Sequence, residues 1–193
     1  LKDASQVLKD KIRAGGVPLI VGTTPAVKAA VKDLANKFNY PYVTERWLGG
    51  TLTNFKTIIS RVQYLKKLRA DKESGRLDKY TKKEKLNLER EMGKLERLFS
   101  GIDTMDKLPA VVVIFDLKNH ETAAHEAKKT NIVSIAVSNT NCDPDTVDYP
   151  IISNDRNIQG INFIATYFEA AIADGRKEAA ADAAKAEESK NQS

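Results

Sequence analysis

Residues 46–55 read Arg-Trp-Leu-Gly-Gly-Thr-Leu-Thr-Asn-Phe and combine side chains that suit contact with a polyanion. Arg46 supplies a permanent positive charge beside the aromatic ring of Trp47, and two glycines break the backbone directly after them. Thr51 and Asn54 add hydroxyl and amide groups, which can cap a helix or donate to sugars and phosphates. Trp47 has a second interpretation, as an anchor in the core or at a domain junction, because tryptophan is mostly buried.

Positive charge is concentrated in the segment that follows this run. Residues 53–98 contain 14 Lys or Arg and 7 Asp or Glu, an excess of seven positive charges, whereas the whole 193-residue chain has a net charge of only +5. A basic segment of this kind favours RNA phosphates as a partner, although exposed charged helix faces are often only solvated. The basic residues expected to contact phosphate are Arg46, Lys56, Arg61, Lys66, Lys67, Lys82 and Lys83.

The histidines and the single cysteine offer little for catalysis or metal binding. His120 and His125 each precede a glutamate, but they are five residues apart, and the H-E-x-x-H zinc motif needs a separation of four. We expect both to be partly exposed helix residues. Cys142 lies in a turn-rich loop with no base beside it in the sequence, so an ordinary buried or half-buried thiol is expected.

The ends of the predicted strands provide two further groups that could bind a ligand. Residues 22–25 (Gly-Thr-Thr-Pro) could offer helix N-terminal amides to a phosphate, but they match neither known glycine-rich phosphate motif, and a plain strand-to-helix turn explains them. Asp116 has no obvious paired carboxylate, so we expect it to cap the following turn. The sequence therefore predicts no catalytic residue, no metal site and no cofactor. A nucleotide-dependent enzyme and a protein–protein adaptor are the alternatives to an RNA-binding protein.

Short apolar runs alternate with helical patterns, which is typical of an α/β domain. Strands are predicted over residues 17–21, 42–44, 110–115, 132–137 and 149–152, and helices over 1–14, 25–38, 120–129 and from about 154 onward. This alternation implies right-handed crossovers and a doubly wound, mostly parallel sheet. We assign residues 1–50 and 101–174 to this discontinuous domain.

Residues 51–100 interrupt the α/β pattern with an insertion. Apolar residues recur at steps of three and four in two stretches, at Phe55, Ile58, Val62 and Leu65 and then at Leu88, Met92, Leu95 and Phe99. A polar turn lies between the stretches, and Thr81 and Glu84 match a capping box at the start of the second. The pattern predicts an antiparallel helical (coiled-coil) hairpin. Residues 175–193 are rich in Ala, Glu and Lys and are predicted to form a disordered tail. The alternative is an extension of the last helix that frays, with disorder beyond about Ala183.

Several of these motifs resemble the bacterial-type family of small-subunit ribosomal protein number two. They are the run at 46–55 with the following Lys-Thr-Ile, Leu-Pro-Ala at 108–110, the strand that ends at Asp116, His-Glu at 120–121, Asn-Thr-Asn-Cys-Asp-Pro-Asp at 139–145, Val-Asp-Tyr at 147–149 and residues 152–155. The motifs occur in the order that the family shows, and the resemblance covers residues 1–174.

The resemblance implies a flavodoxin-like domain with a protruding coiled-coil hairpin and a structural, non-enzymatic role in the small ribosomal subunit. It implies small-subunit ribosomal RNA and neighbouring ribosomal proteins as partners, including the large messenger-binding protein numbered one. It also implies a cytoplasmic ribosome, with an organellar ribosome as the alternative, and no membrane. Family members usually begin with a further segment that carries Gly-His, Trp-Asn-Pro and an extra strand. That segment does not precede Leu1, so we expect the sheet to lack the strand.

Overall fold

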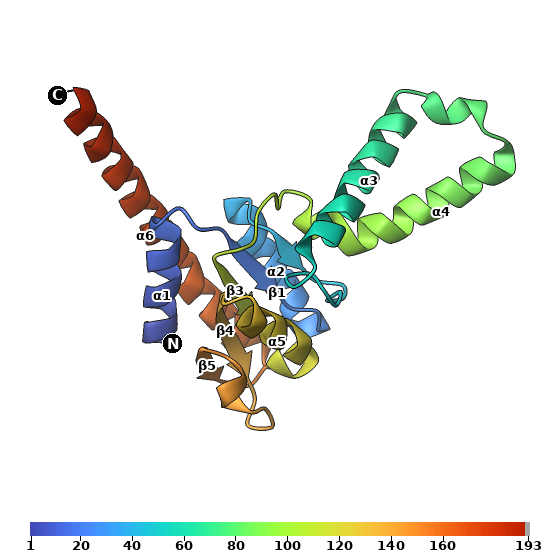
Figure 1. The fold of residues 1–193 in the computed structure, drawn as a ribbon. Coiled ribbons are helices and arrows are strands. Elements are labelled where there is room, and N and C mark those ends of the chain that lie inside the picture. Colours follow the sequence, from blue (N-terminus) through green and yellow to red (C-terminus); the bar gives the residue numbers. More distant parts are fainter. Residues whose placement is uncertain (192–193) are drawn as a thin grey trace.

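A single parallel sheet forms the centre of the molecule (Figure 1). The computed structural model describes the backbone of residues 1–191 and the side chains of residues 1–77 and 80–184. The strands are β1 (Pro18–Val21), β2 (Tyr42–Val43), β3 (Val111–Ile114), β4 (Val133–Ser138) and β5 (Tyr149–Ile152), in the order β2-β1-β3-β4-β5. The chain runs from β1 out to β2 and returns to the other side of β1, so the order reverses between β1 and β3. The predicted α/β class is confirmed, and the arrangement is consistent with a flavodoxin-like fold.

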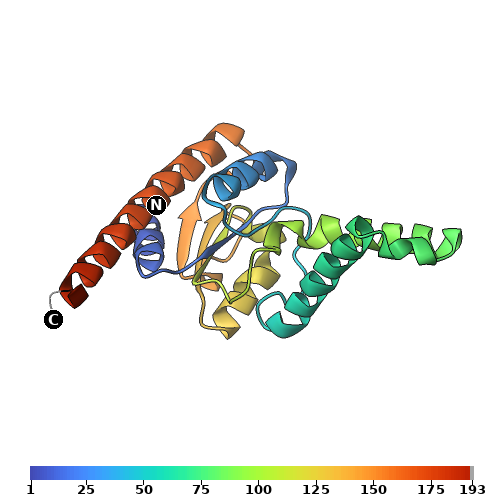
Figure 2. The ribbon, with the colours of Figure 1, turned by 90° about the horizontal axis from the view of Figure 1, so that it is seen from above.

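Helices cover both faces of this sheet, which explains why its strands are mostly apolar (Figure 2). The exceptions are the serines of β4, Ser134 and Ser138. The helices are α1 (Lys2–Arg13), α2 (Pro25–Phe38), α3 (Phe55–Glu73), α4 (Lys82–Phe99), α5 (Glu121–Lys129) and α6 (Ile158–Asn191). In β1, Ile20 packs with buried residues of α1, α2 and α6. Its neighbours Leu19 and Val21 point to the other face and pack with α5 and with parts of α3 and α4.

Helices α3 and α4 occupy the predicted insertion, and we call residues 55–99 the arm. The two helices lie close together near the sheet and diverge toward the connection between them, which contains the short helix η1 (Arg76–Lys79) (Figures 1 and 2). Val62 and Leu65 of α3 are buried in the same apolar cluster as Met92 and Phe99 of α4. This cluster includes the face of the sheet that carries Leu19 and Val21. The base of the arm is therefore part of the domain core. Its coiled-coil geometry stays a prediction.

The start of α4 is set by the predicted capping box. The backbone N–H of Glu84 donates to the Thr81 hydroxyl at 3.4 Å, and the backbone N–H of Thr81 donates to the Glu84 carboxylate at 2.9 Å. These reciprocal bonds satisfy amides that have no partner within the helix. The sequence motif therefore correctly predicted where this helix begins.

Helix α6 continues to Asn191, where the sequence predicted a disordered tail from residue 175. Its extension runs beside α1: Lys9 Nζ lies 2.7 Å from the Glu178 carboxylate, and Arg13 Nε lies 2.7 Å from that of Asp182. These ion pairs, together with the high helix propensity of an Ala-rich sequence, support the longer helix. Residues 192 and 193 of the predicted tail lie outside the described residues.

Candidate nucleic-acid interface

The loop between β2 and α3 is built around one buried carboxylate, that of Glu126 on α5, which is 6% exposed. The carboxylate accepts hydrogen bonds from Trp47 Nε1 at 3.0 Å and from the backbone N–H groups of Gly50 at 2.8 Å, Leu52 at 2.9 Å and Thr53 at 3.1 Å. The Thr53 hydroxyl donates a further bond at 3.1 Å. The loop thus wraps around an anion that belongs to another element and is held against α5.

The loop sequence explains why it can adopt this shape. Gly50 has a φ of +91°, in the left-handed region that glycine adopts more easily than other residues. This bend lets amides on both sides of the turn point toward one carboxylate. Leu52 is 2% exposed and packs in the cluster beneath, so apolar burial and hydrogen bonding hold the loop together.

The hydrogen bonds also keep Glu126 ionised. Burial raises the pKa of this carboxyl, but the bonds donated by Leu52, Trp47, Thr53 and Gly50 outweigh burial and place the pKa below its ordinary value of 4.5. At neutral pH the loop is therefore organised by a full negative charge. Charge-assisted bonds of this kind are stronger than bonds between neutral groups.

Two of the predicted interface residues are buried and serve the loop itself. Trp47 is 8% exposed, and its indole N–H is used by Glu126, in agreement with the interpretation of Trp47 as an anchor. Thr51 is 2% exposed, and its hydroxyl donates to the carbonyl oxygen of Leu48 at 2.6 Å. Neither side chain offers a free polar group to a ligand, so both support the loop rather than face a partner.

Two other predicted residues are exposed at the ends of the loop. Asn54 lies directly before α3, but its side-chain oxygen accepts a bond from the Thr57 hydroxyl at 2.8 Å and does not cap a backbone amide. Arg46 is exposed and forms no ion pair with another described side chain. The loop therefore presents one cation and one amide beside the base of the arm.

The predicted basic residues of the arm are exposed and form no ion pair within the described side chains. They are Lys56, Arg61, Lys66, Lys67, Lys82 and Lys83. Other cations of the arm are neutralised locally: Arg69 lies 3.1 Å from Glu96, and Arg76 lies 3.3 Å from Asp71. The structure thus separates cations that remain available for phosphates from cations that stabilise the arm.

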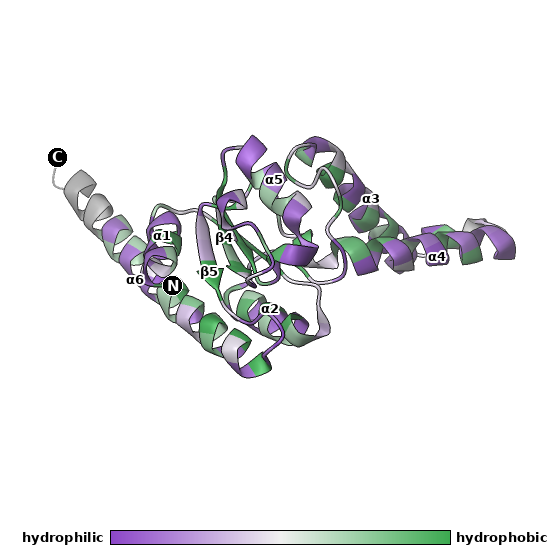
Figure 3. Cartoon of the chain, turned by 90° about the horizontal axis from the view of Figure 1, so that it is seen from below, coloured by the Kyte–Doolittle hydropathy of each residue, from purple (hydrophilic) through white to green (hydrophobic). Residues whose placement is uncertain are grey.

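Helical spacing distributes the available cations over several sides of the arm. At about 100° per residue, Lys56 and Lys67 lie within about 20° of each other, on the side of α3 opposite its buried residues. Lys66 lies roughly 90° from that pair, whereas Arg61 lies roughly 130° from it, toward the buried side of the helix. The first turn of α4 carries the other two. Hydrophilic residues accordingly cover much of α3 and α4 in Figure 3, so the arm does not present one narrow basic stripe.

Glu126 was missed at the level of sequence, where it was considered only as part of a false zinc motif. The sequence did contain a sign that Glu126 is buried. Glu126 lies three positions after Ala123 and directly before Ala127, so helical spacing places it beside the apolar residues that face inward. Such a residue needs partners, but the sequence could not show that a loop more than 70 residues earlier provides them.

The expectation that both histidines are partly exposed was wrong for His120, which is 2% exposed, while His125 is exposed. The His120 ring is turned inward because Nδ1 contacts the carboxylate of buried Asp116 and lies 3.1 Å from its backbone oxygen. The expectation that Asp116 caps the following turn was wrong, because its side chain makes no capping bond there and its carboxylate instead accepts a bond from the Thr24 N–H at 3.2 Å. These residues link the end of β3 to the start of α2.

Metal-ligating side chains, apolar helices and the single cysteine relate to other classes of function. No group of three or more metal-ligating side chains occurs among the described residues. In the same part of the chain, no helix is both long and apolar enough to cross a bilayer. Cys142 is half-buried, within the predicted range.

Comparisons with known proteins agree with the resemblance of the sequence motifs. Residues 1–175 match the family model described as ribosomal protein S2. Proteins named small ribosomal subunit protein uS2 are 43% identical over 176 residues in Acidothermus cellulolyticus and 44% identical over 176 residues in Salinispora tropica, each alignment covering 91% of this chain. The protein of the same name from Coprothermobacter proteolyticus is 39% identical over 177 residues, or 92% of this chain. The alignments span 64%, 60% and 66% of these relatives, respectively.

Proposed function

The chain belongs to the ribosomal protein S2 family, and from this premise we propose that it is a structural component of the small ribosomal subunit that binds small-subunit ribosomal RNA. The observation that carries the proposal is the loop held by Glu126, which places exposed Arg46 at the base of an arm with unpaired cations. Folded RNA is recognised through its shape, phosphates and 2′-hydroxyls, and this surface suits that task. Nothing in the described residues favours the enzyme or the adaptor.

We propose that α3 and α4 form the predicted antiparallel coiled-coil hairpin, with residues 1–50 and 101–174 as its platform. In this arrangement Arg46 and the six predicted arm cations contact phosphates, and Asn54 donates to a sugar or phosphate. The six are Lys56, Arg61, Lys66, Lys67, Lys82 and Lys83. Trp47 and Thr51 act indirectly, by holding the loop. The support is the exposure of the first group and the internal hydrogen bonding of the second.

Neighbouring small-subunit ribosomal proteins are further proposed partners, among them the large messenger-binding protein numbered one. The proposed location is the cytoplasmic ribosome, with an organellar ribosome as the alternative. Co-sedimentation with small subunits in a sucrose gradient at high magnesium concentration tests the assignment to the subunit. A chain that stays at the top of the gradient would contradict it.

Binding to purified small-subunit ribosomal RNA tests the role of the arm. The double variant Lys56→Gln/Lys67→Gln removes two unpaired cations from the outer side of α3 and should weaken binding roughly tenfold. The matched control Lys2→Gln/Lys177→Gln removes two exposed cations from α1 and α6, on the opposite side of the molecule from the arm (Figure 1). Equal effects of the two double variants would show that the arm is not the contact surface.

A further inference from the structure

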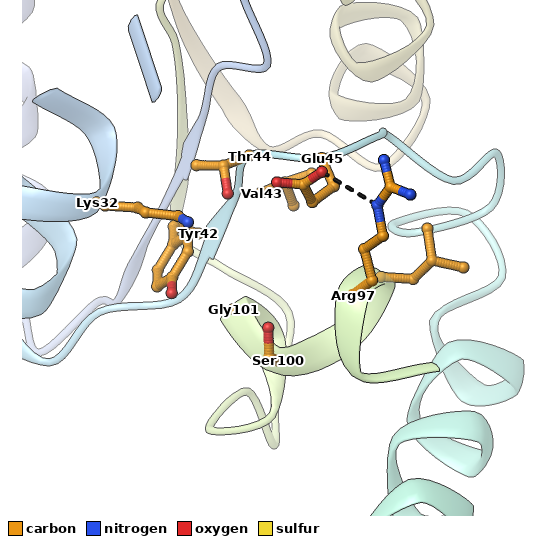
Figure 4. Close-up of a pocket in the computed structure, with 9 residues that line it drawn as sticks. Lys32, Tyr42, Val43, Thr44, Glu45, Arg97, Ser100 and Gly101 are labelled. Carbon is orange, nitrogen blue, oxygen red and sulfur yellow. Dashed lines mark hydrogen bonds and ion pairs between the residues drawn. The ribbon is translucent and has the colours of Figure 1, made fainter. Parts of the chain in front are cut away.

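A polar pocket of about 180 Å³ lies where the carboxyl end of β2 meets the end of α4 (Figure 4). Its walls include Lys32 of α2, Thr44 after β2, Arg97 near the end of α4, and Ser100 directly after α4. Open α/β sheets bind ligands at the carboxyl ends of their strands, and this pocket lies at such an end. None of these four residues was predicted as an interface residue.

Positive charge dominates the pocket. Glu45 is the one carboxylate among the residues that line it, and it lies between two cations, 3.1 Å from Lys28 Nζ and 3.3 Å from Arg97 Nε. Lys32 is exposed and forms no ion pair with a described side chain. Two cations, Lys32 and Arg97, therefore line the pocket together with one carboxylate, and Lys28 next to the pocket further neutralises that carboxylate. The excess positive charge favours an anion even though Glu45 and the carbonyl end of α4 oppose one.

The pocket is built from two parts of the molecule that are packed tightly together. A Cβ atom at Gly101 would collide with the carbonyl oxygen of Tyr42, so glycine allows the segment after α4 to lie directly on β2. This contact holds the segment after α4, which carries Ser100, against β2 at the side of the pocket. Arg97 uses Nε for Glu45, and its side chain is 76% exposed, so its terminal nitrogens remain available to another acceptor.

We propose that this pocket binds one phosphate group of the ribosomal RNA backbone, held by Lys32 from α2 and Arg97 from α4, with the Ser100 hydroxyl as a further donor. This inference rests on the proposed function. Arg46 follows Glu45 directly, so an RNA strand on the loop would pass over the pocket. A phosphate held there would connect the α/β domain to the base of the arm through a ligand as well as through packing.

The test is the salt dependence of binding to purified small-subunit ribosomal RNA. Lys32→Gln should reduce the slope of log affinity against log salt concentration by about 0.7–0.9, the contribution of one phosphate contact. Arg97→Gln should have a similar effect, and the double variant should lose little more, because both side chains hold the same phosphate. Lys177→Gln, on an exposed part of α6 far from the arm, should keep the wild-type slope.

The outcomes of this test distinguish a failure of the pocket proposal from a failure of the proposed RNA-binding function. If the wild-type chain does not bind the RNA, the proposed function itself fails. If it binds and Lys32→Gln keeps the wild-type slope, the pocket is not an RNA contact, and this inference is overturned. A parallel titration with inorganic phosphate, followed through the amide resonances of Thr44 and Ser100, identifies the source. Saturable shifts together with an unchanged RNA slope would indicate a site for free phosphate and would overturn the RNA assignment.

Discussion

A carboxylate on α5 holds together the loop that presents Arg46. Glu126 accepts hydrogen bonds from the Trp47 indole N–H, from three backbone amides of the loop and from the Thr53 hydroxyl. Removing the charge of Glu126 would therefore leave several of these donors close together without an acceptor. An unsatisfied buried donor costs more than the net worth of one hydrogen bond. Glu126 is therefore buried beneath the loop and holds it in shape.

Replacement of this carboxylate by an isosteric amide tests that role. Glu126→Gln should lower the free energy of unfolding by about 2 kcal/mol, because the amide has one acceptor and places an NH₂ group among donors. Chemical denaturation at neutral pH measures the loss. Glu121→Gln, at an exposed position on the same helix, is the control and should have a much smaller effect. Similar losses in both variants would show that the hydrogen bonds to Glu126 contribute little.

The lowered pKa of Glu126 predicts how this contribution depends on pH. A carboxyl whose pKa is lower in the folded than in the unfolded state stabilises the fold above its unfolded pKa, near 4.5. That stability is lost as the pH falls from there through the folded-state pKa. The difference in unfolding free energy between wild type and Glu126→Gln should therefore be constant near neutral pH and shrink below about pH 4.5. Denaturation curves from pH 7 to pH 3 would reveal a constant difference if the assignment is wrong.

At the scale of elements, short strands and marked helix ends made much of the fold predictable. All five strands lie within one residue of their predicted bounds, since glycine, proline and polar residues delimit each apolar run. Helix α4 begins at its capping box for a similarly local reason. The end of α6 was less predictable, because its ion pairs to Lys9 and Arg13 depend on packing against α1.

The cap of α4 gives a prediction at this scale. Thr81→Ala removes the hydroxyl that accepts the Glu84 amide and should destabilise the first turn of α4 by about 1 kcal/mol. The amides of that turn should then exchange with solvent roughly fivefold faster, as measured by hydrogen–deuterium exchange. Ser74→Ala, at the other end of the connection between the helices, serves as the control. No difference in exchange between the two variants would mean that the box does not hold the turn.

At the scale of the whole molecule, the α/β domain provides a rigid core and the arm provides exposed positive charge. The α/β domain supplies the packed platform, and the arm carries cations that have no acidic partner within the described side chains. The buried residues of α3 and α4 belong to the same cluster as the sheet. The base of the arm therefore has a fixed direction, which is what a protein that binds a preformed RNA surface requires.

Salt dependence of RNA binding tests this division of the molecule. If Arg46 and the six arm cations each neutralise one phosphate, the slope of log affinity against log salt concentration should be about −5 to −6. Filter binding from low to moderate salt concentration measures the slope. An affinity that barely changes over this range would show that phosphate contacts do not dominate and would leave the adaptor as the better hypothesis.

The sequence by itself determined the features that depend on neighbouring residues. Runs of apolar residues specify strands, repeats of three and four specify helices, and the motif at 46–55 carries the family resemblance. Only the tertiary structure decided which groups meet. The packing of the chain brings Glu126 under a loop more than 70 residues away, turns His120 inward, and places Lys32 and Arg97 on the walls of one pocket. Spacing along a helix shows which residues share a face, but the element opposite that face depends on how the whole chain packs.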